Sequence, residues 1–548
     1  MSMKPTIVYV VPEETERVAK AAFRKGNIYM KIYEELGNIY NDEQFKELYS
    51  AEGQPGLSPM RVILVIIMQF IEGLSDRQAA EAVRSRIDWK YLLAMKLTDE
   101  GFDYSVLSEF RSRLLSSKAE TLLLDTLLKQ VSELGLLKGK KTQRTDSTHV
   151  LGAIRVLNRL ERVGETLRAA LNIIAIVAGQ WLVERTPSIW YQRYATRVEN
   201  YQFPKSDSAR EQLASNIGED GLLLLQLIEE DKEMSWLKEV EAVKILSQIW
   251  KQEYEDSPKV RLKKNNELES SANIIVSPYD VEARWTTKRG GEWTGYKVHI
   301  TESCEEESPN LITQVLTTQA TTPDNKILND IHKKLEQKGL LPEEHLVDKG
   351  YVDSEILVTS QNKYNVKVIG EIKDDSSWQA RDKKGFDKAN FLIDWQQQKV
   401  TCPQAKQSVK WKENKHPRTI GVIKVKFAQS DCKGCESQDL CTKSPEGREI
   451  FLLPKEQQLA LYQRKAEQNT SEFKKKYALR AGVEGTISQA VSRCDIRQSR
   501  YIGLAKTHLQ MVLSAVAINL VRLAQWFFQI PKSKTRLSSF AKLKPVFS

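Results

Sequence analysis

The chain has 548 residues, enough for two to four domains, because a domain usually takes roughly 100–200 residues. Apolar residues make up 41% of the sequence and charged residues 28%, which excludes a chain that is disordered throughout. The formal net charge of +10 favours a polyanionic partner, with an ordinary basic soluble enzyme as the alternative. Apolar runs such as residues 62–68 are too short for a membrane span, and the N-terminus has no signal pattern. We therefore predict a cytoplasmic protein without a membrane partner.

Residues 1–138 carry helical patterns and are predicted to form an N-terminal helical domain that binds DNA. Ser58 is predicted as an N-cap, with Pro59 at the first position of an unusually apolar helix. Ser75 and Gln78 have the spacing of a capping box, and further helices are predicted at 88–95, 105–115 and 117–138. Short helices joined by turns suit a helix-turn-helix motif, and a packing domain with solvated arginines is the alternative. The arginines that could reach phosphates are Arg77, Arg84, Arg86, Arg111 and Arg113.

Residues 139–150 are predicted to form the first strand of a core sheet, with Asp146 near its middle, because the run is rich in β-branched residues. The pattern is then helical from 151 to 265, which predicts a helical insertion. Its arginines recur at spacings of three and four, as in a solvated face or a surface that lies along DNA: Arg155, Arg159 and Arg162. Its aromatic residues are predicted to pack in the core rather than to stack on exposed bases: Trp181, Trp190, Tyr191 and Tyr194.

Residues 266–375 are predicted to form the main part of a mixed α/β sheet. Strand character begins at Ala272, and Gly290-Gly291 separates two runs rich in aromatic and β-branched residues, which indicates a β-hairpin. A strand at 311–318 and a helix at 325–338 follow. The next apolar run leads into Asp348, and a glycine follows it closely, so this carboxylate is expected where a buried strand ends and the chain turns.

A third acid, Glu484, lies at the start of a helical pattern within residues 456–530, which are predicted to be C-terminal core helices. The surrounding segment is the most basic part of the chain. Two aspartates on strands and a glutamate on a helix could together hold two divalent cations such as Mg²⁺, because carboxylate oxygens suit hard ions. A paired-metal site stabilises both the attacking and the leaving oxygen in phosphoryl transfer.

Four of the six cysteines fall within residues 376–455, which are predicted to form a cysteine-containing insertion. They are Cys402, Cys432, Cys435 and Cys441. Four thiolates can complete a tetrahedral zinc shell, so a structural Zn²⁺ in a zinc ribbon is predicted, with reduced unpaired thiols as the alternative. A basic tail is predicted at 531–548.

Three motifs together resemble the DDE transposases of bacterial insertion sequences, in the IS1182 group that is related to IS4 and IS5. They are Thr145-Asp146-Ser147-Thr148, Asp348-Lys349-Gly350-Tyr351 and Glu484-Gly485-Thr486. The resemblance extends over most of the chain, from the N-terminal helices to Gly503-Leu504-Ala505-Lys506. It implies an RNase H-like catalytic core in which the helical and the cysteine-containing segments are insertions.

The resemblance implies that Asp146, Asp348 and Glu484 are the catalytic acids and hold two Mg²⁺ ions, or Mn²⁺ in their place. The implied activity is cleavage of a DNA strand at a transposon end, followed by its transfer into target DNA. The implied partners are double-stranded DNA, as terminal repeats and as target, and a second copy of the chain in a synaptic complex. Such a protein is expected in the bacterial cytoplasm, associated with the nucleoid.

Tyr477 and Arg480 match the tyrosine and arginine that precede the glutamate in the family signature, which implies contacts with DNA. For Arg480 the alternative is an ion pair with Glu484, one helical turn away. The lysine expected seven positions after the glutamate is Val491 here, so its role is assigned to Arg493 or Lys506. Lys349 is a further candidate for a phosphate contact.

Two other functions agree with the same residues. One is an RNase H-like nuclease without strand transfer, and the other is a catalytically inactive DNA-binding regulator. The presence of all three acids argues against the second.

Overall fold

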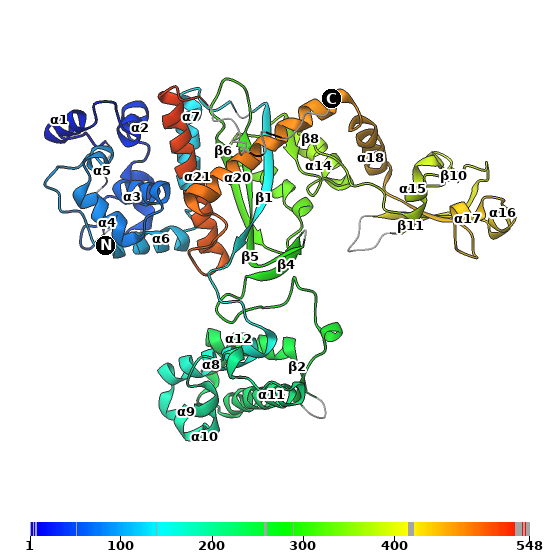
Figure 1. Cartoon of the computed structure of the whole chain (residues 1–548), viewed down its shortest axis with the longest axis horizontal. Helices are drawn as coiled ribbons and strands as arrows, with labels where there is room; N and C mark the ends of the chain where they lie inside the picture. Colours follow the sequence, from blue (N-terminus) through cyan, green and yellow to red (C-terminus); the bar gives the residue numbers. More distant parts are fainter. Residues whose placement is uncertain are drawn as a thin grey trace.

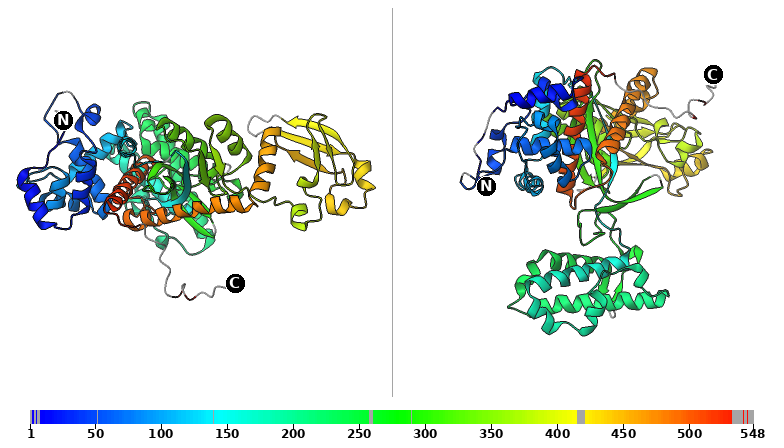
Figure 2. Two further views of the ribbon diagram at one scale, coloured as in Figure 1. Left: turned by 90° about the horizontal axis from the view of Figure 1, so that it is seen from above. Right: turned by 60° about the vertical axis from the view of Figure 1, so that its left-hand side comes forward.

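A computed structural model describes the chain except for residues 1, 4, 6, 7, 51, 139, 257–259, 289, 415–420, 532–539, 541, 542 and 544–548. A central mixed sheet is accompanied by helices from the N-terminal quarter and from the C-terminal quarter of the chain (Figure 1). Two smaller bodies lie apart from the central sheet, and the two views in Figure 2 show them from other directions. The predicted basic tail lies outside the described residues apart from 531, 540 and 543.

The central sheet combines antiparallel and parallel strands, as the sequence predicts. In order across the sheet, β6, β5, β1, β7 and β8 lie side by side, and β4 pairs with the first part of β5. The pairs of β1 with β7 and of β7 with β8 are parallel, and the others are antiparallel. The strands are β1 (Thr142–Leu151), β4 (Arg284–Lys288), β5 (Gly291–Ser303), β6 (Ile312–Gln319), β7 (Glu344–Val347) and β8 (Lys367–Ile369).

Two helices form connections between strands of the central sheet. α13 (Leu328–Gln337) joins β6 to β7, and α14 (Ser354–Tyr364) joins β7 to β8. The predicted β-hairpin at Gly290 is confirmed, but its first strand begins at Arg284 rather than Ala272. Residues 272–283 form turns and loops in its place.

The longest apolar helix is α21 (Leu504–Phe527), which packs on β6 and on the N-terminal helix α3. By length and composition it could cross a membrane, but 78% of its most apolar window is buried in the fold. Asn519 also pairs with both backbone groups of Ile312, at 2.8 Å each, and so fixes α21 to the edge strand β6. We conclude that α21 is a core helix.

The N-terminal helices follow the local signals in the sequence. Ser58 caps α3 (Pro59–Glu72) by accepting from Arg61 N–H, and Ser75 and Gln78 form the predicted capping box. The predicted helix at 117–138 is confirmed only in part, as the shorter α7. The other helices are α1 (Glu13–Ala22), α2 (Ile28–Leu36), α4 (Asp76–Ser85), α5 (Ile87–Leu92), α6 (Ser105–Ser116) and α7 (Leu122–Glu133).

Two of the arginines expected to contact phosphates are held by carboxylates within this helical region. Arg111 is buried and forms an ion pair of 2.5 Å with Asp76. Arg86 pairs with both Glu72 and Asp88. Neither expectation describes these two arginines, because they pair with carboxylates instead of being solvated, whereas Arg77 and Arg84 are exposed.

The first smaller body, which we call the helical body, comprises residues 159–256 and 260–262 and has its own apolar core. Trp181, Trp190 and Tyr194 are buried there as predicted, and Tyr191 is exposed. The predicted arginine face is wrong, because Arg162 is buried and shares the fully buried Glu253 with Arg159. The elements are α8 (Arg159–Val177), α9 (Gly179–Arg185), α10 (Ser188–Tyr194), α11 (Asp207–Glu230), α12 (Glu241–Glu253), β2 (Tyr254–Asp256) and β3 (Val260–Leu262).

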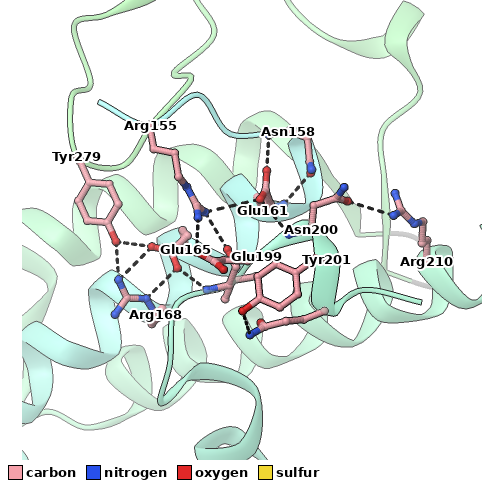
Figure 3. A network of polar contacts seen from close by, with 12 residues as sticks. Arg155, Asn158, Glu161, Glu165, Arg168, Glu199, Asn200, Tyr201, Arg210 and Tyr279 are labelled. Atoms are coloured by element: carbon pink, nitrogen blue, oxygen red, sulfur yellow. Dashed lines mark hydrogen bonds and ion pairs between the residues drawn. The ribbon is translucent and has the colours of Figure 1, made fainter. Parts of the chain in front are cut away.

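A polar network holds the segments that enter and leave the helical body (Figure 3). Glu165 accepts hydrogen bonds from Tyr279 at 2.5 Å and from Val198 N–H at 2.6 Å, and it pairs with Arg168. Arg155, on the entering segment, pairs with Glu199. Because Tyr279 lies on the returning segment, the network joins both connections to α8.

The second smaller body, which we call the cysteine body, comprises residues 378–414 and 421–452. It contains a three-stranded and a two-stranded antiparallel sheet. Its elements are α15 (Trp378–Asp382), β9 (Leu392–Asp394), β10 (Lys399–Thr401), β11 (Ser408–Asn414), β12 (Val422–Phe427), α16 (Gln429–Lys433), α17 (Gln438–Cys441) and β13 (Glu449–Leu452). The chain then returns to the central sheet through α18 (Lys455–Glu467), α19 (Ser471–Tyr477), the 3-10 turn η7 (Ala478–Ala481) and α20 (Gly482–Cys494).

Candidate active site

Strands β1 and β7 bring the two predicted aspartates side by side. Thr145 pairs with Val347 in the parallel register, and each aspartate follows directly, so Asp146 and Asp348 lie at the same level of the sheet. Burial raises the pKa of Asp146, and the charge of Asp348 adds to this effect, whereas Ser147 N–H at 2.7 Å and Arg480 oppose it. Two carboxylates that repel each other in this way gain stability from a cation placed between them.

The turn η7 and helix α20 bring a guanidinium and the third acid to the same place. Arg480 Nη1 lies 3.1 Å from Asp146 Oδ2, and its Nη2 lies 3.4 Å from Glu484 Oε1. The predicted ion pair with Glu484 is therefore present, but it is one half of a bridge between a strand acid and a helix acid. Burial acts to lower the pKa of Arg480, but Tyr477 and the surrounding carboxylates raise it. Arg480 thus remains a cation that holds the two acids together.

The ring of Tyr477 packs against the guanidinium of Arg480. Its ring stacks on Phe473 with centroids 5.8 Å apart, and the Arg480 guanidinium lies 5.6 Å from the centroid of the tyrosine ring. Burial raises the pKa of Tyr477 to about 12, so the phenol stays protonated at neutral pH. It can therefore act as a hydrogen-bond donor and as a face for the cation.

A buried ion network fixes α20 against the sheet. Glu302 on β5 is fully buried and contacts Arg144 at 2.7 Å, Arg522 at 2.8 Å and the Thr486 hydroxyl at 2.5 Å. Arg144 also donates to the Leu479 carbonyl at 2.7 Å, immediately before Arg480. Strands β1 and β5, turn η7 and helices α20 and α21 thus meet at one carboxylate. This network sets the position of Glu484 relative to Asp146.

Gly482 is required for the close approach of α20 to β1. A Cβ atom at this position would lie 1.9 Å from Nη1 and 2.3 Å from Cζ of Arg144. The guanidinium has no room to move, because it is buried and paired with Glu302. The first turn of α20 therefore rests directly on Arg144.

A fourth carboxylate, Asp324, lies beside the turn that carries Asp348. A Cβ atom on Gly350 would lie 3.2 Å from Asp324 Oδ2 and 3.9 Å from Asp348 Oδ2. Burial acts to raise the pKa of Asp324, but Lys297, 2.8 Å away, outweighs it and the pKa is lowered. The sequence indicates only a turn at Pro323-Asp324, so this acid was not predicted as part of the site.

An open pocket of about 510 Å³ lies beside β1 and the hairpin of β4 and β5. It begins at Ser147, next to Asp146, and is lined by two lysines and two aromatic rings: Lys288, Lys297, His149 and Trp293. The His149 and Trp293 rings lie 5.7 Å apart. Cationic and aromatic side chains in one open pocket suit a nucleic-acid strand.

Two family models match the chain. Residues 18–113 match a transposase domain (DUF772), and residues 401–524 match a transposase DDE domain. The chain therefore contains two transposase domains. This pair of domains is typical of IS1182-family transposases, so the resemblance described above is confirmed. Searches of curated proteins and of solved structures found no match.

The matched DDE domain includes Tyr477, Arg480 and Glu484, but the match begins after both aspartates. Asp146 and Asp348 are therefore placed by the geometry of β1 and β7 alone. A DDE domain implies a nuclease or transposase, and the family implies binding to DNA.

The other predicted DNA-binding residues are all exposed, and one of them lies directly beside an acid. Lys349 is exposed on the turn directly after Asp348. Arg493 is exposed on α20, nine residues beyond Glu484, which corresponds to about 13 Å along the helix. Lys506 is exposed in the first turn of α21.

The three predicted acids are Asp146, Asp348 and Glu484, and the Arg480 cation pairs with the first and the last of them. In the described part of the chain, no three His, Cys, Asp or Glu side chains are grouped as ligands of one metal ion. At this site Arg480 lies between the carboxylates of Asp146 and Glu484 and pairs with both. The donor set contains only oxygen, which fits Mg²⁺ or Mn²⁺ rather than zinc.

Proposed function

We propose that the chain is a DNA transposase whose catalytic acids are Asp146, Asp348 and Glu484. The observation that carries the proposal is the adjacency of Asp146 and Asp348 in the register of β1 and β7, with Arg480 linking Asp146 to Glu484. Three antiparallel strands continued by two parallel strands are the arrangement expected of an RNase H-like core. In this proposal the helical body and the cysteine body are insertions into that core, and the N-terminal helices bind DNA.

The three acids would hold two Mg²⁺ ions, or Mn²⁺ in their place. Bound there, the metals would supply the charge stabilisation and the activated oxygen nucleophile of phosphoryl transfer. Arg480 keeps Asp146 and Glu484 in place before metals bind. Its guanidinium fork, once released from these acids, has the geometry to bind a DNA phosphate with two hydrogen bonds.

DNA would lie across the exposed basic residues around the acids. Lys349, Arg493 and Lys506 are all exposed, as is Lys288, which lines the pocket beside Asp146. Double-stranded terminal repeats and target DNA are the proposed partners, bound by a homodimer in the synaptic complex. The proposed location is the cytoplasm, in association with the nucleoid.

The proposal is tested with the full-length protein and a linear duplex that carries an end of its own element. Wild-type protein is expected to cleave one strand at the end only when Mg²⁺ or Mn²⁺ is added. Asp348→Asn should reduce the cleavage rate by at least roughly 10³-fold while the protein still binds the duplex in a gel-shift assay. The control is Asp374→Asn, an exposed acid after β8, which should cleave like the wild type.

A second substrate separates the transposase from the other two functions. A duplex with a pre-cut 3′ end should be joined to a supercoiled plasmid by the wild type. Cleavage without joining would identify a nuclease. Binding without cleavage by the wild type would identify a DNA-binding regulator and would refute the proposed catalytic role of the three acids.

A further inference from the structure

Four cysteines from three separate segments of the cysteine body meet at one small pocket. Cys402 follows β10, Cys432 and Cys435 lie on and after α16, and Cys441 ends α17. All four line a pocket of about 30 Å³, enough for one atom the size of a water molecule. All six cysteines of the chain lie in its described part, and none forms a disulfide. Convergence of four thiols from such distant positions points to a shared ligand.

Two of the sulphur atoms accept hydrogen bonds from the backbone. Lys406 N–H lies 3.4 Å from Cys402 Sγ, and Arg448 N–H lies 3.4 Å from Cys432 Sγ. The Cys402 turn is closed further by a 2.8 Å bond from Cys402 N–H to the Lys406 carbonyl. Backbone donors aimed at sulphur stabilise a thiolate, which is the form that binds a metal.

The cysteine body has little else to hold it together. Among its described residues, seven apolar side chains form the buried core: Phe391, Val400, Ile423, Val425, Phe427, Ile450 and Leu452. A core of this size rarely stabilises a body of roughly 70 residues, and small bodies of this kind usually depend on a disulfide or a structural metal. The two short helices that carry Cys432 and Cys441 pack beside this core rather than inside it.

We propose that Cys402, Cys432, Cys435 and Cys441 bind one structural Zn²⁺ ion. Zinc bound by four thiolates at ~2.3 Å places the sulphur atoms about 3.8 Å apart. No three cysteines are already grouped as metal ligands within the described residues, so binding would draw the sulphurs together. The sulphurs lie on the Cys402 turn, on α16 and the turn after it, and on α17, and the two helices are five and four residues long. The ion replaces the missing core and fixes these helices against β10 and β12.

This site is independent of the proposed catalysis, because the cysteine body holds none of the three acids. Its ligands are soft thiolates that select zinc, whereas the acids offer only oxygen donors. Removal of zinc is therefore expected to loosen residues 378–452 and to leave the Asp146 and Asp348 pair in place.

The test measures the metal directly in the full-length protein, purified with a reductant and without chelator. Mass spectrometry of the metal content should find about one zinc per chain. Titration with a mercurial reagent that blocks thiols should release that zinc, and replacement by Co²⁺ should give the visible absorption of a tetrahedral thiolate site. Both readouts use wild-type protein, so neither depends on the folding of a variant.

Substitution of single cysteines tests which of them bind the zinc ion. Cys432→Ser and Cys435→Ser should each reduce the zinc content to well below half of the wild-type value. The matched control is Cys304→Ser, a half-buried cysteine outside the cysteine body, which should retain full zinc. Wild-type protein without zinc after reduction and incubation with equimolar Zn²⁺, or a disulfide among the four cysteines in non-reducing peptide mapping of freshly purified protein, would overturn the proposal.

Discussion

Glu302 shows how a single buried residue organises the site without touching DNA. Its carboxylate is fully buried and is shared by Arg144, Arg522 and the Thr486 hydroxyl. A buried carboxylate with two arginines contributes little net stability compared with an apolar replacement, but removal of one charge leaves the others unpaired in the interior. The position of α20, and with it Glu484, depends on this residue.

We expect Glu302→Gln to lower the free energy of unfolding by about 3–5 kcal/mol, because both arginines lose their charged partner. Urea unfolding at neutral pH measures this change. Glu306→Gln, four residues away on the exposed surface, is the control and should change the free energy of unfolding by less than about 0.5 kcal/mol. Equal stability of the two variants would show that the network does not bind α20 to the sheet.

Arg480 differs from Glu302 because it joins a partly buried acid, Asp146, to an exposed one, Glu484. The Glu484 side chain is 64% exposed, so the ion pair with Arg480 is screened by water and adds little to stability. The Arg480 ion pairs instead determine where the two carboxylates lie, because the cation sits between Asp146 and Glu484. Sequence spacing alone revealed the contact with Glu484, but the contact with Asp146 spans 334 residues and needed the fold.

Helix α20 contains two glycines that the structure distinguishes. A Cβ atom on Gly482 would collide with Arg144, whereas one on Gly485 would meet nothing within 4 Å. Gly482→Ala should therefore lower the free energy of unfolding by about 1–3 kcal/mol. Gly485→Ala should be neutral or raise it by up to about 1 kcal/mol, because alanine is the better helix former.

The same pair of variants tests the coupling between helix placement and catalysis. Gly482→Ala displaces the first turn of α20 and should slow DNA cleavage, whereas Gly485→Ala should cleave at the wild-type rate. Thermal unfolding and single-turnover cleavage give the two readouts. A Gly482→Ala protein that is as stable and as active as Gly485→Ala would contradict the close packing of α20 on β1.

A chain of buried histidines joins β7 to helices α13 and α14. His345 Nε2 lies 2.7 Å from the Thr145 hydroxyl, its Nδ1 lies 3.0 Å from His332 Nε2, and Ser360 lies 3.4 Å beyond. Burial lowers the pKa of His332 from its ordinary value of 6.5 to about 4, and it lowers that of His345 as well. Both rings are therefore neutral in the folded protein at neutral pH.

Acid should destabilise the protein through these rings. Between pH 6.5 and about 4 the unfolded chain binds protons that the folded chain excludes, so the free energy of unfolding falls as the pH falls. The loss from His332 alone is roughly 2–3 kcal/mol across this range. Urea unfolding at pH 7, 6 and 5 should show this decline, with a shallower pH dependence in His332→Gln. If the free energy of unfolding falls equally steeply with pH in the wild type and in His332→Gln, His332 is not responsible for the decline.

Helix caps and turns could be predicted, because a few neighbouring residues determine them. Contacts between residues that are far apart in the sequence could not be predicted. Ser58, Ser75 and Gly290 mark a cap, a capping box and a hairpin within a few residues, and each was predicted correctly. Arg162 was predicted to lie on a solvated face because helical spacing does not reveal Glu253, 91 residues away. Asp324 was missed for the same reason, since only the fold brings it beside Asp348.

The catalytic assignment also came from motifs rather than from physical pattern. Residues 145–148 and 348–351 each resemble a family motif, and pairing in the parallel register places both acids at one level of the sheet. No periodicity in the sequence indicates that β1 pairs with a strand 200 residues later. One signal in the sequence could have identified Arg144 as part of the site. It lies two residues before Asp146 on β1, so the two side chains lie on the same face of the strand.

At the scale of the whole molecule, the net charge of +10 should govern affinity for DNA. If six to ten phosphates are contacted, the association constant should fall roughly 10³- to 10⁵-fold between 50 and 200 mM salt. Arg493→Gln and Lys506→Gln should each reduce the slope of log K against log salt by about one if that residue contacts a phosphate. Fluorescence anisotropy with a labelled duplex measures the slope. Unchanged slopes in both variants would remove these residues from the DNA interface.

The order of the three acids along the chain has a consequence for the timing of activity. Asp146 leaves the ribosome early, but β1 lies in the interior of the sheet between β5 and β7, and Glu484 follows more than 300 residues later. At bacterial rates of translation, roughly 15–70 s separate the synthesis of the first acid from that of the last. Under the proposed catalytic role of the three acids, a nascent polypeptide is expected to cleave DNA only after residue 484 has been synthesised.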